Sequence, residues 1–346
     1  MAYTTINKST DYFNTKLYTG NGGTQYVTGV GFQPDWLWVK CRSNANGHQL
    51  FDVLRTTYSL SSNASDAEAN RASDGFTSLD SDGFTMNGSG SGGNTNVSGR
   101  TYVGWNWKAN GAGSANTDGS ITSTVSVNTT AGFSIVKYEA SANATIGHGL
   151  GVKPAMVITK SRDDSTNWAS WHKNLTGGNE NDRYVNLNTS AADDNYSNYW
   201  GTGGFTSSVF GVSNTGFHNN SNSMIAYCFA EKKGFSKFGK YTGNANADGT
   251  FVYTGFKPVF FLFKRIDAVK NWHIVDGTRD IDNPTQTIVY PDLSDAEQST
   301  TSVDFVSNGI KIRNGGSFIN ETGGSYIYMA FGQSLVGSNN VPCTAR

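Results

Sequence analysis

The side chains of this sequence that could do chemistry begin with carboxylates in loops rich in Gly, Ser and Asn. They occur as close pairs, at Asp80 and Asp82, Asp163 and Asp164, and Asp193 and Asp194. Two carboxylates can act as acid and base in glycoside hydrolysis, and oxygen-rich loops can ligate Ca²⁺. Because no EF-hand spacing is present, solvated turn residues are the favoured interpretation. Weak calcium ligation and a glycosidase pair stay open as alternatives.

The histidines and cysteines do not form a recognisable site. The five histidines are His48, His148, His172, His218 and His273, and the three cysteines are Cys41, Cys228 and Cys343. No two histidines are spaced at i, i+2 or i, i+4, and no C-x-x-C pair occurs, so we expect no metal, no cofactor and no catalytic residue. The thiols are interpreted as small buried side chains of a protein made in a reducing cytoplasm. His172 and His273 are interpreted as packing residues.

Aromatic rings in a polar loop are the candidate ligand-binding residues. The segment DDNYSNYWG contains Tyr196, Tyr199 and Trp200 among polar neighbours. Sugar-binding sites place a ring under the apolar face of a pyranose, so these three residues are predicted to contact a ligand. Of the three, Trp200 best suits a position in the core.

The composition excludes several classes of protein. The chain has 346 residues, of which 15% are charged and 13% aromatic, with 41 glycines, 36 asparagines and a net charge of −1. This charge excludes the basic surface of a nucleic-acid binder, and no apolar run is long enough to span a membrane. The first residues lack the apolar core of a signal peptide. The composition is typical of a turn-rich β protein.

The elements that must position these residues belong to a threefold internal repeat. Each copy has Gly-x-x-Pro, an apolar run and then Lys and Arg, in the segments GFQPDWLWVKCR, GVKPAMVITKSR and GFKPVFFLFKR. The prolines of this motif are Pro34, Pro154 and Pro258. Eighteen residues later stand Asp52, His172 and Asp276, and Asp-x-x-Arg occurs in the first and third copies.

The repeat predicts three tandem domains, each large enough to bury its own core. They cover residues 1–109 with a short N-terminal segment, 118–233 and 234–332, with a linker at 110–117 and a C-terminal tail at 333–346. The linker is rich in Gly, Ser and Asn and is predicted to be flexible.

Short apolar runs bounded by turn residues predict strands. They lie at residues 35–40, 134–138, 155–160, 259–264 and 326–331. In the first, Trp36 and Trp38 lie on one face and Leu37 and Val39 on the other, which predicts a strand covered on both sides. The segments SDAEANRA and LSDAEQ are predicted to form one or two helical turns. The fold class is therefore all-β, with antiparallel sandwiches.

Long strings of the sequence carry a family resemblance: INKSTDYFNTKLYTGNGGTQYVTGVGFQPDWLWVKCR, TYVGWNWKANGAG, TDGSITSTVSVNTTAGFSIVKY, IGHGLGVKPAMVI, MIAYCFAEKKGFSKFGKYTGN and YIYMAFGQS. From about Ile6 to Phe331 the chain resembles repeat domains in virion proteins of marine tailed bacteriophages, including cyanophages and phages of abundant ocean bacteria. Such proteins are often labelled tail-fibre or tail-associated proteins. The resemblance implies lectin-like sandwiches of the concanavalin-like or jelly-roll kind, and it brings no catalytic motif to any residue here.

The resemblance implies a non-enzymatic virion protein, made in the host cytoplasm and assembled onto the phage particle. We expect a tail-fibre or receptor-binding role, with other virion proteins and host-surface glycans as partners, and neither nucleic acid nor membrane insertion. Analogy with fibres implies a homo-oligomer, with a trimer as the expected form. The first repeat starts within about ten residues of Met1, without the anchoring domain of a typical fibre. Capsid decoration or a tail accessory role is the main alternative, and a polysaccharide depolymerase is the third.

Overall fold

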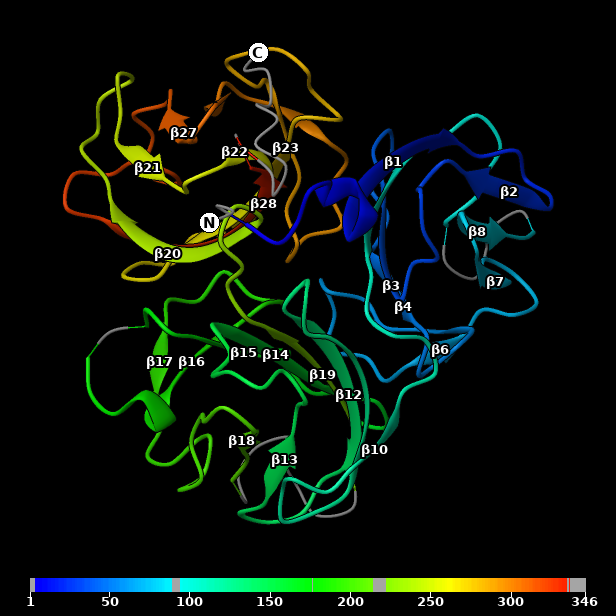
Figure 1. Ribbon diagram of the computed structural model, residues 1–346. Helices are drawn as coiled ribbons and strands as arrows, with labels where there is room; N and C mark the ends of the chain where they lie inside the picture. Colours follow the sequence, from blue (N-terminus) through cyan, green and yellow to red (C-terminus); the bar gives the residue numbers. More distant parts are fainter. Residues whose placement is uncertain (1–3, 89–93, 176, 214–221, 335, 337–346) are drawn as a thin grey trace.

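The regular secondary structure of the chain is almost entirely antiparallel β-strand, arranged as three units around one centre, one unit for each copy of the repeat (Figure 1). The computed structural model describes residues 4–88, 94–175, 177–213, 222–334 and 336. Within these residues the only helices are two 3₁₀ turns, η1 (Ser9–Asp11) and η2 (Glu180–Asp182), and neither could cross a membrane. The all-β prediction is confirmed.

Each unit contains an inner sheet, and the three inner sheets share one strand order. In unit 1 the order is β1 (Phe13–Thr19), β9 (Thr101–Trp107), β3 (Trp36–Cys41) and β4 (Gln49–Asp52). In unit 3 it is β20 (Ser236–Thr242), β28 (Ser325–Gln333), β22 (Lys257–Arg265) and β23 (Trp272–Asp276). In unit 2 it is β12 (Phe133–Glu139), β19 (Ser223–Phe229), β14 (Met156–Ser161) and β15 (Ala169–His172).

Unit 2 extends its inner sheet to eight strands, with two more on each side. These are β10 (Ser114–Asn116) and β11 (Ser123–Asn128) beside β12, and β16 (Arg183–Asn186) and β17 (Asp194–Asn195) beside β15.

A smaller outer sheet covers the outward face of each inner sheet. The outer sheets are β2 (Gln25–Thr28), β8 (Gly83–Met86) and β7 (Ser78–Asp80) in unit 1, β13 (Thr145–Gly147) and β18 (Val209–Gly211) in unit 2, and β21 (Phe251–Tyr253), β27 (Gly309–Ile312) and β26 (Val303–Val306) in unit 3. Two short hairpins complete the fold, β5 (Tyr58–Ser59) with β6 (Ala69–Asn70) and β24 (Thr287–Ile288) with β25 (Gln298–Ser299).

Side chains of the inner strands alternate between two kinds of hydrophobic core. One face of each inner sheet packs in a core shared by all three units, and the other face packs in a core that belongs to one unit alone, its private core. Trp36 and Trp38 of β3 point to a hydrophobic cluster common to all three units, whereas Leu37 and Val39 pack in the core of unit 1 alone. The expectation of a strand covered on both sides is confirmed, because successive side chains of a strand point to opposite faces.

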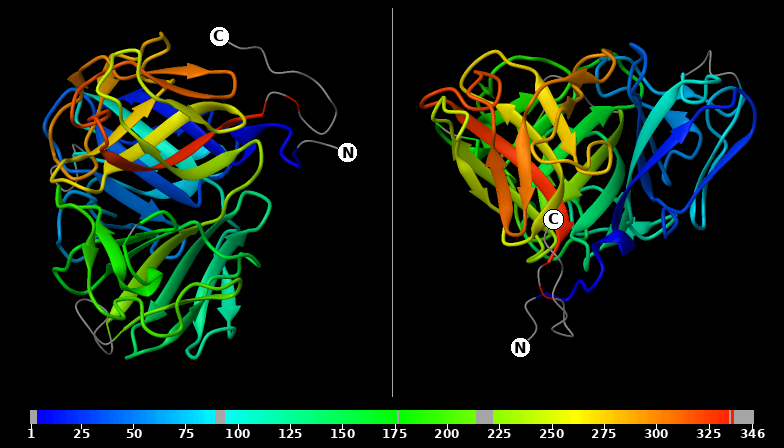
Figure 2. Two further views of the ribbon diagram at one scale, coloured as in Figure 1. Left: turned by 90° about the vertical axis from the view of Figure 1, so that its left-hand side faces the viewer. Right: turned by 90° about the horizontal axis from the view of Figure 1, so that it is seen from above.

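The shared core is aromatic and joins the units pairwise. The Trp36 ring stacks on Tyr227 of unit 2 with 4.3 Å between ring centroids, and Phe13 stacks on Phe331 of unit 3 at 5.1 Å. Phe229 and Phe331 complete the contact between units 2 and 3 at 6.2 Å. The views of Figures 1 and 2 show the three units packed side by side around this centre, so the molecule is one closed block.

The segment predicted as a flexible linker is held by hydrogen bonds. Asp35 accepts hydrogen bonds from the backbone N–H groups of Ala109 and Gly111, at 2.6 and 3.1 Å. Residues 114–116 then form β10, which pairs with β11 of unit 2. The prediction of a flexible connector at 110–117 is therefore wrong, because these residues extend a sheet.

The two ends of the described chain meet at one side of the block (Figure 2). Ser9 N–H donates to Gln333 Oε1 at 2.7 Å, and Ile6 is buried in the shared core. The predicted tail at 333–346 begins with the last residue of β28, and residues 337–346 lie outside the described part of the chain.

Candidate functional site

The predicted ligand-binding aromatics separate into one surface ring and two interior rings. The Tyr196 residue is 51% exposed, whereas Tyr199 is 6% exposed and Trp200 fully buried. Tyr199 stacks on Tyr184 with 3.8 Å between ring centroids, and Trp200 Nε1–H donates to the carbonyl of Arg183 at 2.9 Å. Ligand stacking on Tyr199 and Trp200 is therefore not supported, since both rings are used by the core of unit 2. Tyr196 stays a prediction.

Two of the paired acids join their loops to segments distant in sequence. Asp82 accepts hydrogen bonds from the N–H groups of Gly31 and Gly29, at 2.6 and 3.0 Å, and these bonds lower its pKa. Asp163 accepts from Ser223 N–H at 2.7 Å in the same manner. In the part of the chain that the structure describes, no three His, Cys, Asp or Glu side chains come together as a metal-ligand group.

Three of the other paired acids bond to residues nearby in the sequence. Asp80 accepts from the hydroxyls of Ser78 and Thr85, at 2.6 and 2.5 Å. Asp193 forms an ion pair with Arg183, and Asp194 accepts from the Tyr184 hydroxyl at 2.9 Å.

The histidines and thiols are interior groups, as their interpretation as packing residues requires. His172 and His273 are buried, and burial lowers the pKa of each imidazole to about 3. Cys41 and Cys228 are buried free thiols. His218 and Cys343 lie outside the described residues.

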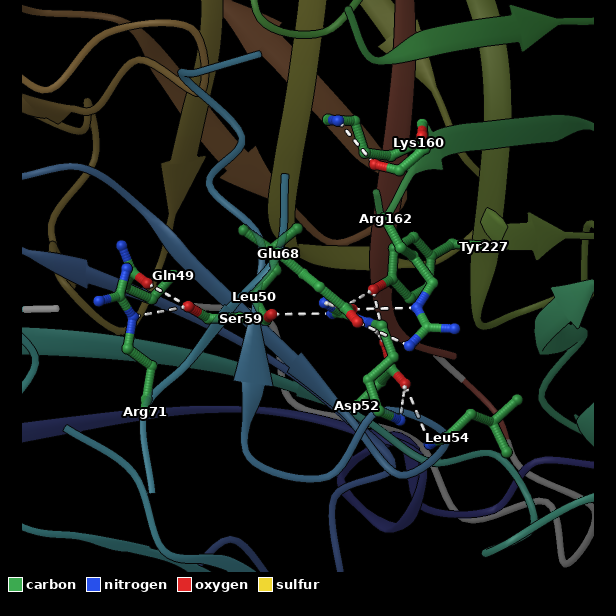
Figure 3. Close-up of polar contacts among 12 residues, drawn as sticks. Gln49, Leu50, Asp52, Leu54, Ser59, Glu68, Arg71, Lys160, Arg162 and Tyr227 are labelled. Carbon is green, nitrogen blue, oxygen red and sulfur yellow. Dashed lines mark hydrogen bonds and ion pairs between the residues drawn. The ribbon is translucent and has the colours of Figure 1, made fainter. Parts of the chain in front are cut away.

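A buried polar cluster joins unit 1 to unit 2 (Figure 3). Asp52, at the end of β4, accepts from Arg55 Nε at 2.6 Å and from the Tyr227 hydroxyl of unit 2 at 2.7 Å. Glu68 of unit 1 receives a two-pronged hydrogen bond from Arg162 of unit 2, at 3.0 and 2.6 Å. These fully or largely buried charges compensate one another, although Arg55 Nη1 has no hydrogen-bond partner among the described residues and lies 3.6 Å from Glu68 Oε2.

An equivalent cluster joins unit 3 to unit 1. Asp276 forms an ion pair with Arg279 and accepts from Trp105 Nε1–H of unit 1 at 3.0 Å. The Glu297 carboxylate accepts two hydrogen bonds from the Arg42 guanidinium of unit 1, at 3.1 and 2.8 Å, and one from the Arg279 guanidinium at 2.7 Å. Burial alone would raise the pKa of Glu297, but the two guanidinium groups hold it below its usual range.

The junction of unit 2 with unit 3 uses the same positions without the buried ion pair. His172 takes the place of Asp52, and its Nε2 lies 3.2 Å from the Tyr328 carbonyl oxygen of unit 3. Leu175 takes the place of Arg55 and packs against the shared core. The three contacts run in one direction around the ring, from unit 1 to unit 2, to unit 3 and back to unit 1.

The segments SDAEANRA and LSDAEQ, which contain Glu68 and Glu297, were predicted to form helical turns. This prediction is wrong, because neither segment is helical. Glu68 and Glu297 each end an SDAE tetrapeptide, and their N–H groups donate to the carbonyls of Arg162 and Arg42, both at 2.8 Å. In unit 2 the N–H of Asp193 donates to the Ile266 carbonyl at 2.9 Å. Hydrogen bonds to the neighbouring unit thus hold this backbone in a non-helical conformation. The SDAE string, which occurs in units 1 and 3, is the sequence feature that could have indicated these contacts.

A second ring of contacts uses the residues fourteen positions after each repeat proline. Trp168 Nε1–H donates to the Ser61 carbonyl of unit 1 at 2.8 Å, and Trp272 Nε1–H donates to the Asn186 carbonyl of unit 2 at 2.9 Å. In unit 1 the position is His48, whose Nε2 lies 2.8 Å from the Tyr290 carbonyl of unit 3. In every unit, therefore, one ring nitrogen contacts a backbone carbonyl oxygen of the preceding unit, with unit 3 preceding unit 1 in the ring.

The lysine of the repeat motif is the second-last residue of strands β3, β14 and β22, and its side chain is buried. Lys40, Lys160 and Lys264 are buried, and each Nζ donates to the carbonyl of the next residue, at 2.6, 2.7 and 2.7 Å. Burial lowers the pKa of each ammonium group to about 8. These side chains organise the turn that follows the strand, so they are structural groups.

A surface bowl lies where unit 2 passes into unit 3. It has a volume of about 600 Å³ and is lined by Glu231, Lys233, Gly234, Ser236, Lys237, Tyr253, Thr254 and Gly255. Tyr253, the last residue of the edge strand β21, is 61% exposed. This volume lies within the range of small-molecule sites. The lining comes from two separate segments, 231–237 and 253–255, so no local sequence pattern marks the bowl.

A family model described as a domain of unknown function, DUF7483, matches residues 8–334. The chain therefore belongs to the DUF7483 family. No curated protein matches the sequence.

Proposed function

We propose that this DUF7483 protein is a non-enzymatic structural protein of a tailed-phage particle that recognises host-surface glycans, as a tail-fibre or receptor-binding protein does. The resemblance of its repeats to virion proteins supports the first half of the proposal. The bowl beside Tyr253 supports the second half and is the single observation on which recognition depends.

Several properties of the bowl suit a saccharide. The Tyr253 ring stands exposed at the rim, where the apolar face of a pyranose can stack on it. Its neighbour Val252 is buried in the core of unit 3, so the backbone that carries the ring is anchored.

The proposal is tested in two steps. Gold-labelled antibodies against the full chain should decorate the tail or its fibres on purified phage particles. Purified protein should bind host cells, and a glycan array should identify the saccharides it retains. Absence of the chain from purified particles, or no binding to any host envelope preparation, would reject the corresponding half of the proposal.

A purely structural role on the particle, as capsid decoration or a tail accessory, is the second candidate. It is favoured by the closed ring of inter-unit contacts and by the burial of Tyr199 and Trp200, which removes two of the three predicted ligand contacts. Label found over the head lattice would select this alternative.

A further inference from the structure

We infer that the bowl beside Tyr253 selects a carboxylated saccharide, a sugar of the uronic acid class, over a neutral one. This inference rests on the proposed glycan recognition and adds the chemical class of the ligand. It follows from the charges that line the bowl and from the way its one carboxylate is already used.

The carboxylate of Glu231 is committed to protein partners. Its Oε1 lies 2.7 Å from Lys173 Nζ and accepts a hydrogen bond from Phe238 N–H at 3.0 Å. Lys237 Nζ lies farther from the same oxygen, at 3.6 Å. The carboxylate is therefore compensated mainly by Lys173.

The bowl has an excess of positive charge. Two lysines, Lys233 and Lys237, line it together with one carboxylate, Glu231, so the lining side chains carry a formal charge of +1. The chain as a whole has a net charge of −1, so this excess is local. A concave site of one sign attracts ligands of the opposite sign.

The aromatic ring and the ammonium groups face the same volume. Tyr253 ends the edge strand β21, and Lys237 lies on the edge strand β20, so both project from open sheet edges into the bowl. A pyranose stacked on Tyr253 would place a ring carboxylate within the volume that Lys237 and Lys233 line. Stacking and charge pairing then act on one sugar.

Lysines on edge strands also protect against aggregation, and β20 supplies a matched control for this role. Lys240 is an exposed lysine of the same strand, three residues beyond Lys237 and therefore on the opposite face. It does not line the bowl. Tyr26 of β2, which is 73% exposed, is the matching control for Tyr253.

The test is isothermal titration of the full chain with a galacturonate trisaccharide and a galactose trisaccharide, at low and high salt. We expect about tenfold tighter binding of the acidic sugar at low salt, with a smaller difference at high salt. Tyr253→Ala should weaken both sugars about tenfold, and Lys237→Gln should remove only the preference for the acid. Lys240→Gln and Tyr26→Ala should leave both affinities unchanged.

Failure of the inference and failure of the proposed function have different signatures. Equal affinity for the two sugars, lost on Tyr253→Ala, would overturn the inference and leave glycan recognition intact. Equal losses from Lys237→Gln and Lys240→Gln, with none from Tyr253→Ala, would reveal nonspecific attraction and also overturn the inference. No binding of either sugar or of any host preparation would overturn both.

Discussion

Replacement of Asp292 by asparagine should stabilise the protein at neutral pH. Asp292 Oδ1 accepts a hydrogen bond from Trp272 N–H at 3.0 Å, whereas its Oδ2 is buried without a hydrogen-bond partner. Burial raises the pKa of this carboxyl to about 7. At neutral pH the folded protein must therefore either hold a proton on Asp292 or bury a poorly solvated charge.

The other two units already have asparagine at this position. Asn188 Oδ1 accepts from Trp168 N–H at 2.9 Å, and Asn188 Nδ2 donates to Asn167 Oδ1 at 2.9 Å. In unit 3, Asn271 precedes Trp272 as Asn167 precedes Trp168. An asparagine at position 292 can therefore keep the bond to Trp272 and donate its amide to Asn271.

The size and sign of the effect follow from the change in pKa. The unfolded carboxyl titrates near 3.8 and the folded one near 7, so the folded state binds the proton more tightly. Stability is therefore lost as the pH rises from about 4 to about 7, with an upper bound of about 4 kcal/mol. The variant also loses the attraction between Asp292 and Lys264, and we expect a net gain of about 2 kcal/mol above pH 7.

Urea unfolding followed by tryptophan fluorescence at pH 4.5, 6 and 8 measures this difference. The gap between Asp292→Asn and the wild type should widen with pH, while Asp282→Asn, an exposed acid of the same unit, should track the wild type. The histidine titrations are common to all three proteins and cancel in the comparison. A gap that does not change with pH, or a variant less stable than the wild type at pH 8, would refute the reasoning.

Three further predictions concern the packing of the units. Arg279→Met should cost about 3–5 kcal/mol in urea unfolding because it leaves the buried Asp276 without its cation. Burial holds the pKa of His172 at about 3, whereas the unfolded imidazole binds a proton below about pH 6.5, so this residue should contribute a loss of about 2 kcal/mol in stability between pH 7 and pH 5. The change in stability over this range should therefore differ between His172→Gln and the wild type by about that amount. Trp200→Ala should cost about 3–5 kcal/mol, whereas Tyr196→Ala should leave the melting temperature unchanged, which calorimetry can check.

The sequence predicts well those features that arise within one strand or one repeat. Alternation in β3 correctly predicts two covered faces, because the 2-residue period fixes which side of a sheet each side chain meets. The repeat prolines mark strand starts because proline lacks an N–H donor. Pro34 and Pro154 precede β3 and β14, and Pro258 lies at a bulge near the start of β22.

Contacts between units are less accessible from the sequence. The SDAE loops look helical because their local composition favours a capped turn, yet Glu68 and Glu297 are held open by arginines of another unit. The burial of Trp200 and the two-segment lining of the bowl at Tyr253 likewise depend on residues distant in sequence. Tertiary contacts override local preference at these positions.

The repeat also suggested that each copy could bury its own core, and the shared centre argues against independent folding. In unit 2, Val157 and Trp171 pack within the unit, but Ile158, Tyr227 and Phe229 face the other two units. Residues 118–233 expressed alone would expose this apolar inner face, and a large exposed apolar patch makes a protein prone to aggregation.

We therefore expect the fragment to aggregate, or to bind a hydrophobic dye without a cooperative unfolding transition, while the full chain unfolds cooperatively. Size-exclusion chromatography and calorimetry of both proteins provide the comparison. A monomeric fragment that melts at the temperature of the full chain would show that the private core of unit 2 is sufficient. The aromatic centre would then serve association of the units, whereas the ring of contacts from Asp52 to Tyr227 and from Asp276 to Trp105 indicates that the units fold as one body.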